Sequence, residues 1–281
     1  MKKTFYLSAL IVLTLALAFS FSACSATPVE KRMAAAWGPY ERLTYDVIED
    51  GEIIGSYVST IESIENIGGI PLKINGVQIS FTAGYLIKTE LTIGNTKCYG
   101  EVFIHKINNN QIFRPEASLF KKEVDGEITE STYIKYENGS AKVTAAKNGD
   151  TQNYDVKLKS VFFDNLSIYY VLRAMPFEEG AASLTFLVPL SDGSAAKMTA
   201  STSAAAPLSG IGASAYFSGA ESVDAYLTSL SRSTFVPGVS YYVCFAKPNA
   251  AADGAEVKKA PLKIIENTVT YMLKEIKTSR G

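Results

Sequence analysis

Asp-Gly and Asn-Gly pairs recur along this chain between segments in which apolar and polar residues alternate. Both residues of such a pair accept a positive φ at low cost, so a two-residue turn can join strands whose twist it matches. The segments EVDGEI, YENGSAKV and KNGDTQNYDVKL are therefore predicted to form successive β-hairpins. The pairs begin at Asp50, Asn75, Asp125, Asn138, Asn148, Asp192 and Asp253.

The alternation also predicts which strand residues face the interior. Apolar residues recur with a period of two over 43–47, 77–81 and 87–93, as in half-buried strands. After the turn at Asn148, we expect Tyr154, Val156 and Leu158 to face inward and the residues between them to face water. Parallel strands would need regular helical crossovers, which the chain lacks, so the strands are predicted to be antiparallel.

The stretch DNLSIYYVLRAMPFEEG, residues 164–180, is the exception to the strand pattern. Asp164 is a suitable N-cap, and Pro176 ends a helix because it lacks an N–H donor. The helix between them is apolar on nearly every side, so the inner face of the sheet must cover it. A helix lying on a membrane is the alternative, but it would carry several basic residues, and only Arg173 is present.

The predicted fold is thus mainly β: a curved, mostly antiparallel sheet, as a half-barrel or open barrel, with one short apolar helix packed on its concave face. Residues 191–220 are rich in Ala, Ser and Gly, so we expect a mobile loop or a poorly packed sheet edge there. Strand character resumes in VSYYVCFAK and in the closing LKIIENTVTYMLKEI. One β-rich domain is predicted over 39–278.

The N-terminal sequence MKKTFYLSALIVLTLALAFSFSACSATP has the basic, apolar and small-residue order of a bacterial export signal. Its Phe21-Ser22-Ala23-Cys24 resembles a lipobox, which implies cleavage before Cys24 and acylation of that cysteine with chains such as palmitate. Residues 1–23 would then be a lipoprotein signal peptide, and 24–38 a tether. Cleavage after Ala26 and a retained membrane anchor are the alternatives.

These features predict an extracytoplasmic protein of the cell envelope, held through Cys24 on the cell membrane or the outer membrane. The formal net charge is -1. It becomes more negative when Lys2 and Lys3 are removed with the signal peptide. This charge argues against nucleic acid as a partner, and a protein partner is not identified.

Few residues suit catalysis or metal binding. His105 is the one histidine, and we expect it to be a half-exposed structural residue on a strand. Cys98 and Cys244 lie in strand-like runs outside any CxxC pair, and either a disulfide between them or two buried free thiols is possible. Glu178-Glu179 is the most conspicuous carboxylate pair, but neighbours in sequence rarely face each other across a cleft. No catalytic residue, metal site or cofactor is predicted.

Aromatic residues are abundant, with 16 Tyr and 14 Phe against 1 Trp. Tyrosines suit a cleft that has an apolar wall and hydroxyls at its mouth, and Tyr133 and Tyr136 are candidates for such a wall. The predicted ligand cavity lies between helix and sheet. Its candidate residues are Leu166, Tyr169, Tyr170, Leu172, Arg173 and Tyr154.

The segments ERLTYDVIE (41–49), FRPEASLFKKEV (113–124) and 164–180 together resemble domain-of-unknown-function family 3108, a family of exported bacterial proteins. The resemblance covers roughly 40–189. It implies a curved antiparallel sheet with a helix against it, similar to lipid-binding envelope lipoproteins, and carries no activity. In the helical segment, the matching residues are Leu166, Ser167, Tyr169, Tyr170, Leu172, Arg173 and Pro176.

Three functions agree with these observations. The first is non-catalytic binding of an apolar ligand, such as a lipid or an acyl chain, between sheet and helix. The second is an envelope scaffold or assembly factor that binds a protein partner. The third is a hydrolase that acts on cell-wall material through carboxylates such as Glu178 and Glu179.

Overall fold

The computed structural model describes residues 38–65, 71–108, 111–174, 183–209, 222–232, 241–246 and 259–279. Several predictions concern other residues and lie outside this part of the chain. They are the signal peptide 1–23, the lipidation of Cys24, the tether up to residue 37, and the roles of Pro176, Glu178, Glu179 and the Asp253-Gly254 turn.

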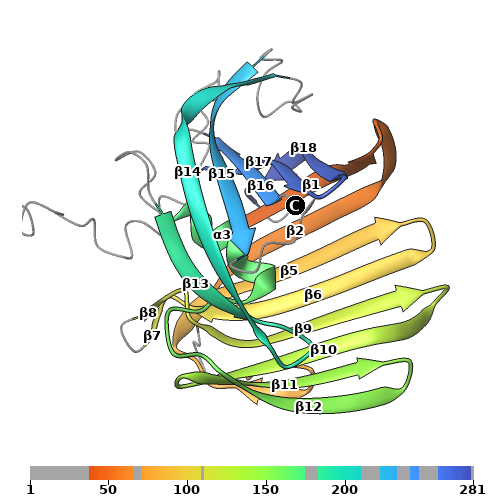
Figure 1. The fold of residues 1–281 in the computed structure, drawn as a ribbon, viewed down its shortest axis with the longest axis vertical. Helices are drawn as coiled ribbons and strands as arrows, with labels where there is room; N and C mark the ends of the chain where they lie inside the picture. The colour runs from red at the N-terminus through yellow and green to blue at the C-terminus, as the bar shows by residue number, and fades with distance from the viewer. Residues whose placement is uncertain are drawn as a thin grey trace, which may run out of the picture.

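Within these described residues, fourteen strands form one antiparallel sheet (Figure 1). Two small hairpins accompany it: β3 (Leu72–Ile74) with β4 (Val77–Ile79), and β7 (Ile107–Asn108) with β8 (Gln111–Ile112). In spatial order the sheet contains β12 (Asp150–Lys157), β11 (Ser140–Lys147), β10 (Glu127–Glu137), β9 (Pro115–Val124), β6 (Thr96–His105), β5 (Ala83–Ile93), β2 (Glu52–Glu65), β1 (Tyr40–Glu49), β18 (Val269–Lys277), β17 (Pro261–Glu266), β16 (Tyr241–Ala246), β15 (Ser222–Arg232), β14 (Ala195–Ser209) and β13 (Ser183–Pro189).

The sheet curls until its two edges nearly meet, which makes a nearly closed barrel. The segment after β12 lies beside β13, where Phe162 and Leu187 form a parallel bridge. The N–H of Phe163 donates to the carbonyl of Leu187 at 3.0 Å, and the N–H of Leu187 donates to the carbonyl of Val161 at 2.9 Å. The Phe162 ring stacks on that of Tyr136, at a centroid distance of 5.7 Å. The predicted mainly β, antiparallel class is confirmed.

The hairpin turns lie where the Asp-Gly and Asn-Gly pairs predict them. Among the pairs in the described residues, four have positive φ at both residues, as the two-residue turn requires. They begin at Asp50, Asn75, Asp125 and Asn148. The three hairpins formed by β9 to β12 are confirmed, with each strand paired to the next.

Burial alternates along most strands as expected. Leu43, Tyr45 and Val47 are buried on β1, and Val156 and Leu158 are buried in and just after β12. Val77 is the exception, because it is 42% exposed. It belongs to the β3–β4 hairpin, which packs Ile74 and Ile79 against the outer face of the barrel.

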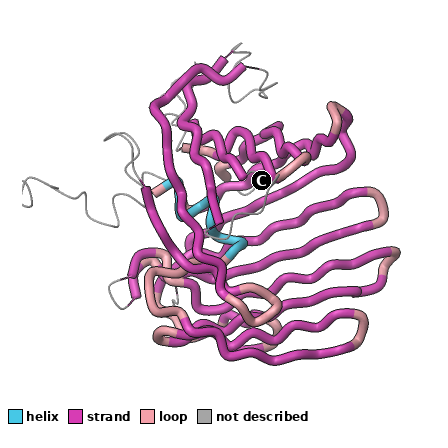
Figure 2. The backbone as a smooth tube through the Cα atoms, viewed as in Figure 1, coloured by secondary structure: helices cyan, strands magenta, loops and turns pink. Residues whose placement is uncertain are grey.

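The predicted apolar helix lies inside the curved sheet, and it is shorter than the sequence indicated (Figures 1 and 2). A 3-10 turn, η1 (Asn165–Ser167), leads into α3 (Ile168–Arg173). Asp164 caps η1, since its carboxylate accepts from the N–H of Leu166 at 2.8 Å. On the sheet, Gly100 makes room for this segment, because a Cβ there would lie 2.8 Å from Leu166 Cδ2. The predicted position of the helix on the concave face is confirmed.

The Ala- and Ser-rich region contains a long strand, so the expectation of a loop or sheet edge was wrong for β14. This strand lies between β13 and β15 and hydrogen-bonds to both. Backbone pairing does not require bulky side chains, and Ala196, Ala200 and Thr202 still alternate inward as buried residues. Thr202 also hydrogen-bonds across to Thr228 at 2.9 Å.

Candidate functional site

A partly open cavity of about 350 Å³ lies between the helical segment and the inner face of the sheet. This volume is at the lower end of the range for small-molecule sites, roughly 300–1,000 Å³. Much of the wall is apolar and comes from both halves of the chain. Its apolar residues include Leu91, Leu166, Ile168, Val188, Met198 and Ile264.

The cavity lies near the end of the barrel that carries the β5–β6 and β17–β18 turns. Leu91 and Cys98 both line it, and each is within a few residues of the turn at Gly94 and Asn95. Glu266 also lines it and immediately precedes the positive-φ turn residue Asn267. The helical segment therefore forms its floor, and the cavity extends toward these turns.

Two of the six predicted cavity residues line this space, namely Leu166 and Tyr169. Tyr170, Leu172 and Arg173 are buried in the core, and none of them is among its lining residues. On so short a helix, positions one or two residues apart point in different directions. Tyr154 belongs to a separate apolar cluster, where its ring lies against Gly193.

Two tyrosine hydroxyls converge on Glu266 in the polar part of the wall. Tyr169 donates to Oε1 of Glu266, and Tyr271 donates to Oε2 at 3.3 Å. Burial raises the pKa of the Tyr169 hydroxyl well above its usual value, and the negative charge of Glu266 raises it further. Both effects keep this hydroxyl protonated at neutral pH. Tyr169 therefore stays a donor, and the carboxylate already has partners within the protein.

The two cysteines in the described part of the chain, Cys98 and Cys244, are free thiols. Cys98 lines the cavity, and Cys244 is buried on β16. Burial is the largest cause that raises the pKa of each thiol, so both stay protonated at neutral pH. A protonated thiol is a poor nucleophile, so Cys98 contributes wall surface.

The predicted cavity residue Arg173 is instead part of a buried ion pair. Its two terminal nitrogens donate to the Glu41 carboxylate on β1 at 2.6 and 3.0 Å. Burial alone would lower the pKa of Arg173, but the charge and hydrogen bonds of Glu41 outweigh this and raise it. Next to it, the Tyr170 hydroxyl hydrogen-bonds to Ser59 Oγ on β2 at 2.6 Å. These contacts fix the helix to β1 and β2.

The other candidate tyrosines, Tyr133 and Tyr136, are not among the cavity-lining residues either. Tyr136 donates to the Asp164 carboxylate at 2.6 Å and so holds the start of η1. Burial raises the pKa of Asp164, although hydrogen bonds from Ser118, Tyr136 and Leu166 partly offset this. Tyr133 packs with the cluster on the outer face of the barrel.

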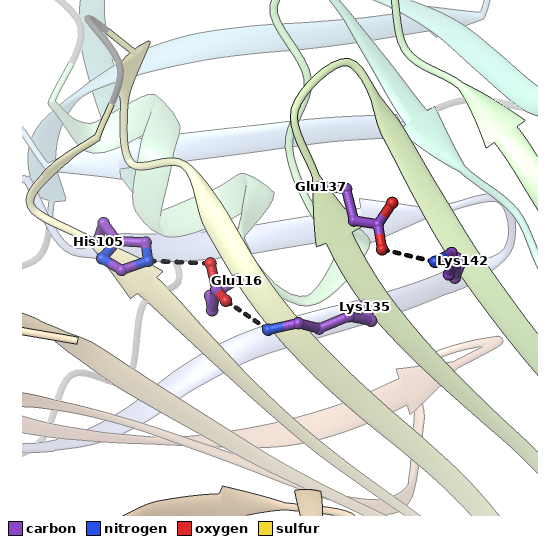
Figure 3. A network of polar contacts seen from close by, with 5 residues as sticks. All are labelled: His105, Glu116, Lys135, Glu137 and Lys142. Carbon is purple, nitrogen blue, oxygen red and sulfur yellow. Dashed lines mark hydrogen bonds and ion pairs between the residues drawn. The ribbon is translucent and has the colours of Figure 1, made fainter. Parts of the chain in front are cut away.

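His105 is buried, rather than half-exposed as expected. Its Nε2 lies 3.2 Å from Oε2 of Glu116, and Oε1 of Glu116 accepts from Lys135. Figure 3 shows these two contacts, with the separate pair Glu137–Lys142 nearby. The His105 ring also makes an edge contact with Phe103, at a centroid distance of 5.2 Å. These contacts link β6, β9 and β10 away from the cavity.

The Glu116 contacts predict a pH-dependent contribution to stability. Burial alone would raise the pKa of Glu116, but His105 and Lys135 together lower it below the usual 4.5. The stability that ionised Glu116 contributes is therefore fully present above about pH 4.5, the pKa in the unfolded chain. It is lost as the pH falls through the lower pKa of Glu116 in the folded protein. Glu116→Gln should cost about 1–2 kcal/mol in urea unfolding at pH 6, and the difference should shrink at pH 3. Glu127→Gln, at an exposed position, is the control. A cost for Glu116→Gln that stayed the same at both pH values would contradict this role.

Comparisons with known proteins add little to this geometry. No protein-family model and no curated protein matches the chain. One matching solved structure is a crystal structure of a beta-barrel-like protein of domain of unknown function DUF1849 from Brucella abortus. Its sequence identity is 10% and its TM-score 0.48, over 87% of this chain and 100% of that chain. A similarity at this level says nothing about function, and the resemblance to family 3108 stays a prediction.

Proposed function

We propose that this protein is a non-catalytic, lipid-anchored protein of the cell envelope that binds an apolar ligand, such as a lipid or acyl chain, between α3 and the sheet. The observation that supports the proposal is the partly open cavity with its largely apolar wall. Transfer of apolar surface from water into such a space stabilises a complex by roughly 25 cal/mol per Å².

The pairing of the one carboxylate among the described wall residues also favours an apolar ligand over one rich in hydrogen-bond donors. The Glu266 carboxylate accepts hydroxyls from Tyr169 and Tyr271, so the ligand does not need to supply donors to it. Sites that recognise strongly polar ligands instead present unpaired groups, whose desolvation the ligand must offset. The cavity therefore suits a hydrocarbon chain better than a sugar or a peptide.

The arrangement of reactive groups supports a non-catalytic role within the described part of the chain. Glu266 is the one carboxylate among the described lining residues, whereas glycoside hydrolysis uses two across the scissile bond. Cys98 is a protonated thiol, and His105 does not line the cavity.

The proposed address depends on the N-terminal sequence. Acylation at Cys24 would hold the protein on a membrane face outside the cytoplasm, close to a source of acyl chains. In the part of the chain that the structure describes, no helix has both the length and the apolar character to cross a membrane. We also propose membership of family 3108 on the sequence resemblance.

Blocking the cavity tests ligand binding. Ala196 lines the cavity and Ala204 is exposed, and both lie on β14. Protein purified without residues 1–24 should show a co-purifying ligand in native mass spectrometry. Because Ala196→Phe fills the site, it should lower the bound fraction several-fold, whereas Ala204→Phe should leave it unchanged. Ala196→Leu, a smaller filling change, serves if the Phe variant melts early.

The same proteins give a second readout with the uncharged dye N-phenyl-1-naphthylamine, whose fluorescence rises in apolar surroundings. The unmodified protein and Ala204→Phe should raise the fluorescence equally, and the Ala196 variants should raise it less. A clean apo mass in repeated preparations, together with no dye response, would overturn the proposed function.

A further inference from the structure

We infer that the cavity selects single-chain amphiphiles with an anionic head group, and that this head group pairs with Arg232. The inference rests on the proposed function, because it specifies which apolar ligand the cavity takes. It is carried by the position of the two charged residues in the wall. Among the described residues that line the cavity, Arg232 is the one cation and Glu266 the one anion.

The strand registers place these two charges apart. Leu230, Tyr241 and Glu266 form a row across β15, β16 and β17, since Leu230 pairs with Tyr241 and Tyr241 with Glu266. Arg232 lies two residues beyond Leu230 on the same face of β15. Arg232 therefore lies about 7 Å from this row along the strand direction. It also lies two strands, or about 10 Å, from Glu266 across the sheet. A head group at Arg232 thus avoids the carboxylate.

Arg232 has the exposure and charge to receive an anion. It is the last residue of β15, it is exposed, and it makes no hydrogen bond or ion pair with another described residue. Its positive charge also reaches the exposed Asp192 carboxylate in the turn between β13 and β14: hydrogen bonds from Ser194 are the main cause of the lowered pKa of Asp192, and Arg232 lowers it further, so a bound head group competes with Asp192 for the guanidinium. A guanidinium binds a carboxylate or phosphate through two parallel hydrogen bonds.

Apolar wall adjoins Arg232 on the inner side of the sheet. Met198 pairs with Arg232 across β14 and β15, and Leu230 precedes it on the same face. Ala196 and Val188, which pair across β14 and β13, belong to the same wall. A hydrocarbon chain whose head lies at Arg232 can therefore run along these residues, and a cavity of about 350 Å³ favours one chain over two.

The test compares two ligands of equal chain length, dodecanoate and 1-dodecanol, below their aggregation limits. Each displaces N-phenyl-1-naphthylamine from the purified protein that lacks residues 1–24. Dodecanoate should bind more tightly than the alcohol. Arg232→Gln should weaken dodecanoate by about tenfold or more and leave dodecanol unchanged. Arg42→Gln is the matched control, because Arg42 alternates with buried Leu43 on β1 and is not among the described residues that line the cavity.

The outcomes separate this inference from the proposed function. Equal affinity for acid and alcohol, or equal loss of both in Arg232→Gln, would refute head-group selection while leaving apolar binding intact. Failure of the unmodified protein to bind the dye and either ligand would remove both proposals. An alkyl phosphate of the same length gives a further arm, because tighter binding of it than of dodecanoate identifies a phosphate head.

Discussion

Replacing Leu172 with aspartate should destabilise the protein by about 4 kcal/mol or more, enough to unfold a domain of ordinary stability. Leu172 is 1% exposed on α3, and it belongs to the main apolar core. The substitution removes buried apolar surface and places an unpaired carboxylate in the interior. Urea unfolding followed by circular dichroism measures the change, and the midpoint should fall sharply or the transition should be lost.

Leu227→Asp is the matched control for Leu172→Asp. Leu227 is 42% exposed on β15, so the new carboxylate stays hydrated and the unfolding midpoint should change little. A similar, small effect at both positions would mean that α3 does not form part of the core. The cavity floor would then be absent, and the proposed binding site with it.

Arg173→Met should cost about 3–5 kcal/mol, because it leaves the Glu41 carboxylate buried without its partner. Arg173 is fully buried, Glu41 is 4% exposed, and two hydrogen bonds join them. Glu41→Gln should destabilise for the converse reason. The double variant Glu41→Leu/Arg173→Met should recover most of the loss, since an apolar pair of similar volume replaces the ions without an unpaired charge.

The comparison pair for this experiment is Glu137 and Lys142, which lie 2.8 Å apart with side chains that are 42% and 60% exposed. Lys142→Met should change the free energy of unfolding far less than Arg173→Met, because exposed ion pairs contribute little. If Arg173→Met cost no more than Lys142→Met, the Glu41 contact would not hold the helix. If the double variant did not recover stability, the packing of the arginine side chain, and not its charge, would account for the loss in Arg173→Met.

The local features of this fold can be predicted from the sequence, because they depend on neighbouring residues. The Asp125-Gly126 and Asn148-Gly149 turns need positive φ at both residues, and this requirement is visible in the dipeptides. The helix can also be predicted, since Asp164 caps it from an adjacent position. The hairpins in the N-terminal half of the sheet can therefore be predicted from their turn sequences.

The candidate site could be predicted only in part, because it joins strands that are distant in sequence. Glu266 accepts from Tyr169, which is 97 residues away, and no local pattern relates the two. Arg173 was predicted to line the cavity because it belongs to the apolar helix that faces the sheet. Its partner Glu41 is 132 residues away and buried on another strand. Burial of an ion pair cannot be read from spacing.

The pairing of β1 with β18 has a consequence for how the chain is made. These strands are the first and last of the sheet along the sequence, yet they are hydrogen-bonded neighbours in its middle. During synthesis, β1 therefore has an open edge until β18 has been made. An unpaired edge is a template for association with other chains, so an interrupted or truncated product is at risk of aggregation. Rapid pairing of β18 with β1, or a chaperone that covers the open edge of β1 until then, would protect the nascent protein.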